Sequence, residues 1–102
     1  MKIAIAATSQ ETDAQIAMQG GRTPYYLFID TEHGSSEILP NPASVIERGA
    51  GRQAAAFLIS RGVDKVVAGD FAPKFRAELE GSGIICTEMT GTVSKIIAEL
   101  SS

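Results

Sequence analysis

The pattern of apolar and polar positions predicts strands that alternate with helices. Residues 3–7 are apolar on both faces of a strand, as expected for a central strand that helices cover on both sides. Residues 25–29 and 36–39 predict an antiparallel hairpin, because aromatic and β-branched residues flank the turn-forming stretch 30–34. Pro40 ends that hairpin, which places its second strand at a sheet edge.

The second half of the chain predicts helices that are stopped by glycines and separated by short buried strands. Gly62 and the segment 81–83 are expected to end two helices, because glycine readily adopts the left-handed conformation of a C-terminal cap. Proline is favoured at the first position of a helix, where no N–H is needed. The expected elements are a helix over 51–61, a strand over 64–68, a helix that begins at Pro73, a strand over 84–86, and a final helix that Thr90 or Thr92 caps.

These elements predict a five-stranded mixed α/β sheet of order 3-2-1-4-5, with strand two antiparallel to strand one and helices on both faces. Right-handed crossovers place strands four and five on one side of strand one and the hairpin on the other. The order reverses between strands one and four, so the crevice at their C-terminal ends is the expected ligand site. The residues expected there are Thr8, Ser9, Gly69 and Asp70, with residues 88–91, including Gly91, alongside.

Two glycine-rich turns predict a site for an anion. Gly49 and Gly51 leave bare backbone N–H groups at the start of a helix, where the helix dipole favours negative charge. Arg22 and Arg48, beside Gly21 and Gly49, could form a cationic clamp or be solvated surface cations. The ligand classes to test are therefore a phosphate, an oxyanion or an anionic metal cluster.

Composition narrows the class of protein. The 102 residues predict one domain, and 44% apolar with 21% charged residues is typical of a soluble globular protein. A net charge of -3, with scattered basic residues, argues against nucleic-acid binding. One cysteine excludes an internal disulfide, and the apolar stretch 3–7 is too short for a signal peptide or a membrane span. We therefore expect a cytoplasmic protein that does not bind membranes.

The candidates for metal ligation are few, and no catalytic set is evident. Cys86, near the end of the last expected strand, could be a metal ligand or a buried small apolar residue. One thiol and one histidine, His33 in the hairpin turn, cannot complete a four-ligand iron-sulfur site, although a symmetric homodimer could present two copies of Cys86. Residues 3–7 contain no acid for a two-metal nuclease, and no nucleophile–histidine pair or Walker loop is present, so an enzyme is the least favoured class.

The segment 9–23 shows no convincing periodicity. Loops of this length in small domains are often functional. Gln19, Gly20 and Gly21 suggest little burial and much backbone freedom, so we expect this segment to be mobile and to close over the crevice when ligand binds.

Several short motifs in fixed order resemble the dinitrogenase iron-molybdenum cofactor biosynthesis family, the small proteins related to nitrogenase accessory factors, over nearly all of residues 1–102. The residues that carry the resemblance are Met1 to Ala6, Gly21 to Tyr26, Asn41-Pro42, Gly49-Ala50-Gly51, Gly62-Val63-Asp64, Ala68 to Pro73 and Gly83-Ile84. The resemblance implies a ribonuclease H-like three-layer fold in one nitrogenase accessory factor-like domain. It also implies a non-catalytic protein that holds, carries or helps to assemble an iron-sulfur or molybdenum-containing cluster.

The chain departs from the family pattern at two places. Family members often carry a His-Phe pair before the Gly-Arg-x-Pro-Tyr segment and a histidine before the Gly-x-Gly turn, where this chain has Gln19-Gly20 and Arg48. An amide side chain is a poor metal ligand, and a guanidinium does not coordinate metals. Arg22, Arg48 and the backbone N–H groups can still bind an anion with both changes in place. The alternatives are a sensor of small anions or nucleotides, and an interaction module that docks on a cofactor-assembly or redox partner.

Overall fold

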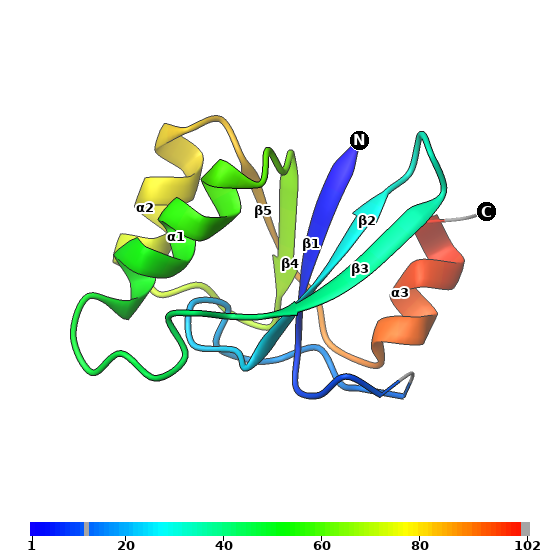
Figure 1. The fold of residues 1–102 in the computed structure, drawn as a ribbon, viewed down its shortest axis with the longest axis horizontal. Helices are drawn as coiled ribbons and strands as arrows, with labels where there is room; N and C mark the ends of the chain where they lie inside the picture. The colour runs from blue at the N-terminus through cyan, green and yellow to red at the C-terminus, as the bar shows by residue number, and fades with distance from the viewer. Residues whose placement is uncertain (12, 101–102) are drawn as a thin grey trace.

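The computed structural model describes residues 1–11 and 13–100 and contains the expected mixed sheet (Figure 1). The strand order is β3-β2-β1-β4-β5, as predicted. β2 is antiparallel to β1 and β3, whereas β4 runs parallel to β1 and β5. The elements are β1 (Lys2–Ala7), β2 (Tyr25–Asp30), β3 (Ser35–Pro40), α1 (Ala50–Ser60), β4 (Lys65–Ala68), α2 (Pro73–Gly81), β5 (Ile85–Glu88) and α3 (Val93–Leu100).

Helices lie on both faces of the sheet, with α1 and α2 on one side and α3 on the other (Figure 1). β1 is apolar on both faces because each face belongs to a separate core. Ala4 and Ala6 pack in the core under α1 and α2, and their small side chains let the helices approach closely. Ile3 and Ile5 pack in the second core, against α3. The result is a three-layer protein of the ribonuclease H-like class.

The helix boundaries follow the signals in the sequence closely. Gly62 and Gly83, in the turns after α1 and α2, both have positive φ (71° and 81°). Pro73 occupies the first turn of α2. Thr92 rather than Thr90 caps α3, since its Oγ1 accepts a hydrogen bond from the Lys95 amide at 3.4 Å.

The last strand is the one element whose placement was wrong. We expected it over 84–86, but Ile84 is buried before the strand starts and β5 covers Ile85–Glu88. The parallel register with β4, which pairs Lys65 with Ile85 and Ala68 with Glu88, sets these bounds. Cys86 therefore lies in the first half of the strand, opposite Val66, and not near its C-terminal end.

The premise that the segment before β2 offers little burial is also wrong. Ala14, Ile16, Gly20 and Gly21 are buried, and the backbone of this stretch pairs with three other segments. Its hydrogen bonds include Ala17 N to Ala6 O at 2.9 Å, Gly69 N to Ala17 O at 2.8 Å, Gly20 N to Asp70 O at 3.1 Å and Ile16 N to Gly91 O at 2.9 Å. Residues 14–21 thus close the C-terminal end of β4 as part of the packed structure. In the described part of the chain, no helix is long and apolar enough to cross a membrane.

Candidate functional site

A small cavity lies beside the first turn of α1, where three segments of the chain converge. Its volume is about 270 Å³. The loop before β2, the start of α1 and the start of α2 each contribute to its wall. The residues that line it are Gln19, Gly21, Arg22, Gly51, Asp70, Ala72 and Phe75.

Close packing around Phe75 explains the glycines at this cavity. Phe75 is fully buried. A Cβ at Gly20 would lie 3.0 Å from both Phe75 Cε2 and Ala68 Cβ, and a Cβ at Gly21 or Gly51 would lie 3.4 Å from Phe75. Gly49 is different, because it lies in open space and has a φ of 73°. Gly20, Gly21 and Gly51 therefore let the three segments meet, and Gly49 supplies the left-handed turn before α1.

Two buried polar side chains hold the segment 20–23 in place. Tyr26 is buried on β2 and donates its hydroxyl hydrogen bond to the Gly20 carbonyl. Burial raises the pKa of Tyr26, which keeps the hydroxyl a neutral donor. Asn41 donates from Nδ2 to the carbonyl oxygens of Gly21 (3.1 Å) and Thr23 (2.9 Å). The wall of the cavity is thus anchored from β2 and from the loop after β3.

The two arginines of the predicted clamp do different things. Arg22 lines the cavity, but its guanidinium donates to the carbonyl oxygens of Ile46 (2.9 Å) and Glu47 (3.0 Å). It therefore holds the loop that leads into α1. Arg48 lies on that loop and lines a separate groove along α1. The structure links Arg22 to the loop that carries Arg48 without bringing both side chains into one cavity.

The electrostatics of the cavity are mixed. α1 begins at Ala50 with no side-chain cap and no acidic residue in its first turn, so its first amides have no partner within the helix. Those amides and Arg22 favour an anion. Asp70 also lines the cavity, and its negative charge opposes an anion.

The expected crevice at the ends of β1 and β4 is occupied by the chain itself. Met18 covers Gly69, where a Cβ would lie 2.5 Å from Met18 Sδ. Thr8 Oγ1 accepts a hydrogen bond from the Gln15 amide at 3.2 Å, and the Gly91 carbonyl accepts one from Ile16. Ser9 lines a groove of about 400 Å³ between α3 and the β2–β3 hairpin. Of the four residues expected in this crevice, only Asp70 lies in the cavity at α1, because residues 14–20 fill the space between them.

Cys86 also lies away from this cavity. It is partly buried on β5 and packs against the core under α1 and α2. Burial raises the pKa of the Cys86 thiol, and the neighbouring Arg76 only partly offsets this effect. A thiol that holds its proton is a weak metal ligand.

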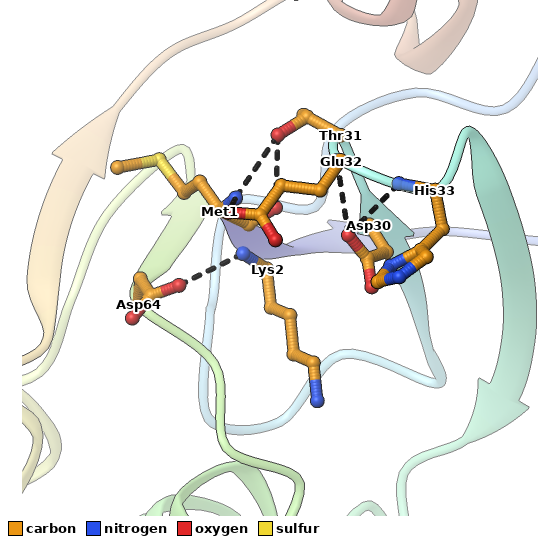
Figure 2. Close-up of polar contacts among 7 residues, drawn as sticks. All are labelled: Met1, Lys2, Asp30, Thr31, Glu32, His33 and Asp64. Atoms are coloured by element: carbon orange, nitrogen blue, oxygen red, sulfur yellow. Dashed lines mark hydrogen bonds and ion pairs between the residues drawn. The ribbon is translucent and has the colours of Figure 1, made fainter.

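The described residues contain one grouping of three potential metal ligands, Asp30, Glu32 and His33 at the β2–β3 turn. It lies at the end of β2 that pairs with Lys2, at the opposite end of the sheet from the cavity. Figure 2 shows why these side chains gather. Asp30 Oδ1 accepts hydrogen bonds from the amides of Glu32 (3.0 Å) and His33 (3.4 Å), and Oδ2 lies 2.8 Å from His33 Nδ1. The grouping is explained as an aspartate-stabilised turn, and His33 is exposed as expected.

This turn makes a testable contribution to stability at low pH. The hydrogen bond from His33, together with the turn amides, lowers the pKa of Asp30. Its ionised form therefore stabilises the folded protein above the pKa of the unfolded chain, and the stabilisation is lost as pH falls through the lowered folded pKa. We expect Asp30→Asn to be slightly less stable than the wild type at neutral pH and equal to it at the acid end. Urea denaturation across this pH range measures the difference, and a constant difference at every pH would contradict the assignment.

Sequence reasoning missed Tyr26, Asn41 and Phe75 as residues that build the site. Tyr26 and Asn41 appear in the sequence only as parts of family motifs or of an expected strand, and Phe75 only as a position in the helix expected from Pro73. An asparagine between two prolines, Pro40 and Pro42, was the available signal, since asparagine side chains in turns commonly hydrogen-bond to nearby backbone.

Comparison with known proteins agrees with the fold class. The family model described as "Dinitrogenase iron-molybdenum cofactor" matches residues 1–102. The apo form of the orange protein from Desulfovibrio gigas superposes with a TM-score of 0.87 at 24% identity, over 96% of this chain and 84% of that one. A putative NifB protein from Thermotoga gives a TM-score of 0.82 at 24% identity, over 98% and 86%. A search of curated proteins finds no match.

The fold defines a ribonuclease H-like α/β protein. The family match is more specific, and the chain belongs to the dinitrogenase iron-molybdenum cofactor family. This membership relates it to the handling of that cofactor or of a similar cluster. At their level of identity, the two solved structures show the shared fold alone.

Proposed function

We propose that residues 1–102 act as one nitrogenase accessory factor-like domain that binds and carries an anionic molybdenum- or iron-sulfur cluster without catalysing a reaction. The cluster is its cargo and binds in the cavity at the start of α1. The observation that carries this proposal is the uncapped first turn of α1 beside a cavity edged by Arg22. Family membership supplies the class of ligand.

The donor set supports capture by charge rather than coordination. An iron-sulfur cluster held by the protein needs several thiolates. The chain has one cysteine, which lies outside the cavity, and the grouping of three potential ligands found in the described segments lies at the far end of the sheet. Arg22 and backbone N–H groups would instead hydrogen-bond to the outer sulfur or oxygen atoms of a preformed cluster.

The size of the cavity favours a compact ligand. Sites for ordinary small molecules usually measure about 300–1,000 Å³. At about 270 Å³, this cavity is smaller, and the buried Phe75 is one of its lining residues. A small metal-sulfur anion therefore suits it better than a nucleotide.

Titration with tetrathiomolybdate, a simple molybdenum-sulfur anion, tests the proposal through its visible absorption under anaerobic conditions. We expect Arg22→Gln to weaken binding by about 1.5–3 kcal/mol, the range for charged hydrogen bonds. Arg22→Lys should retain part of the affinity because it keeps the charge. Cys86→Ser should leave the affinity unchanged, and Arg48→Gln should have a smaller effect than Arg22→Gln.

Asp70→Asn separates charge capture from metal ligation by the sign of its effect. If the cavity captures an anion, removing the Asp70 carboxylate strengthens binding, because it removes a like charge. If Asp70 is a metal ligand, the same change weakens binding. Loss of the bound cluster in Cys86→Ser, or unchanged affinity in every variant, would overturn the proposed site.

A further inference from the structure

A second concave surface runs along the outer side of α1. It is a groove of about 450 Å³ between the loop 46–49 and the helix. Gly49 lines this groove, whereas Gly51 lines the cavity, so the two hollows flank the same turn of α1. We call it the α1 groove and define it by Ile46, Arg48, Arg52, Ala56, Ile59 and Glu78.

Three apolar side chains, Ile46, Ala56 and Ile59, line the α1 groove among its polar residues. α1 already buries one stripe in the core, which includes Ala54 and Leu58. Ala56 and Ile59 lie outside that stripe, and Ile59 is 39% exposed. Val45, next to the groove residue Ile46, is 87% exposed. Apolar side chains that gather at a groove indicate an interaction surface, whereas isolated ones carry no such meaning.

The rim of the α1 groove is basic. The side chains of Arg48 and Arg52 are exposed and make no hydrogen bond or ion pair with any residue that the structure describes. Arg61 and Arg76, by contrast, are paired with Glu37 (2.7 Å) and Glu88 (2.9 Å).

Two further charges set the balance of this surface. Glu78 is the one acid among the groove residues. Arg52 lies in the first turn of α1, where its positive charge opposes the helix dipole. The charge of Arg52 therefore does not stabilise this helix. The groove is thus a basic patch on a protein with a net charge of -3, and an acidic partner would be steered to it.

We propose that the α1 groove docks a segment of a second protein that carries apolar side chains flanked by carboxylates. The apolar side chains would cover Ala56 and Ile59, and the carboxylates would pair with Arg48 and Arg52. This inference rests on exposure and charge and does not require the proposed cargo. If both proposals hold, the partner binds beside the same turn of α1 that borders the cavity, where a cluster could pass between the two proteins.

A display library of random short peptides, selected on the folded protein, tests the docking chemistry without a known partner. We expect the enriched peptides to combine acidic and apolar residues. Their affinity, measured by fluorescence anisotropy, should fall about tenfold in Arg52→Glu and in Ile59→Ser and should weaken as salt is added. Arg52→Glu is expected to fold, since an acid in the first turn of a helix is favourable.

Lys95→Glu is the matched control, because it makes the same change of charge at an exposed position on α3, on the other face of the sheet. It should change the affinity less than twofold. Three results would overturn the proposal: enriched peptides that are basic or lack apolar residues, no enrichment, or equal losses in Arg52→Glu and Lys95→Glu. Self-association that Ile59→Ser abolishes would also overturn it and assign the groove to a second copy of this chain.

Discussion

Asn41→Ala is expected to lower the free energy of unfolding by about 2–4 kcal/mol, because it leaves buried backbone groups without partners. Asn41 is 2% exposed. Its Nδ2 donates hydrogen bonds to the carbonyl oxygens of Gly21 and Thr23, and its Oδ1 accepts a hydrogen bond from the Ala43 amide at 3.0 Å. Alanine makes none of these hydrogen bonds. Urea denaturation measures the loss.

Gln53→Ala provides the control for Asn41. Gln53 is an exposed amide side chain on α1, and its substitution should change stability by less than about 0.5 kcal/mol. Asn41→Ala should also weaken tetrathiomolybdate binding, since Asn41 holds the segment that carries Gly21 and Arg22 to the cavity. A loss of stability as small as that of Gln53→Ala would show that the three hydrogen bonds do not hold this segment.

Gly69→Ala is expected to cost about 2–3 kcal/mol, through overpacking rather than through loss of a contact. The new Cβ would lie 2.5 Å from Met18 Sδ and 2.9 Å from Met18 Cα. The side chain of Met18 can move, since it is 59% exposed, but its backbone is held by the hydrogen bond from Asp70 N to Met18 O. Adding Met18→Ala to this variant should therefore recover only part of the stability.

Gly81→Ala tests whether the effect is specific to the close approach at Gly69. A Cβ at Gly81 meets nothing within 4 Å, and Gly81 is the last residue of α2. Alanine there should be neutral or stabilise the protein by up to about 1 kcal/mol. Thermal unfolding of both variants gives the comparison, and equal behaviour would mean that residues 17–20 move aside freely.

The topology was predictable because each strand and helix carries a local signal. Residues 3–7 are apolar at every position, which is expected only for a strand buried on both faces. The turn residues after Asp30, the glycine at 62 and the proline at 73 mark where elements end and begin. Once the elements are known, the right-handed crossover rule leaves few possible orders for the strands.

The site was only partly predictable, because long-range contacts decide it. The sequence indicated glycines, arginines and Asp70 as candidates, and Gly21, Arg22, Gly51 and Asp70 do line one cavity. It did not indicate that Met18 would cover Gly69 or that Arg22 would donate to the carbonyl oxygens of Ile46 and Glu47. The segment before β2 has no periodic pattern, so its path depends on backbone pairing with residues far along the chain.

By itself, therefore, the sequence determined the α/β class, the order of the strands and the family, since local propensity, periodicity and short ordered motifs are properties of the chain. The tertiary structure decided which candidates meet. It separated Arg48 from Arg22, placed Cys86 in the first half of β5 and removed Thr8, Ser9, Gly69 and Gly91 from the cavity. The physical reason is that buried backbone groups must find hydrogen-bond partners and buried side chains must fill space, and these demands are met between segments distant in the sequence.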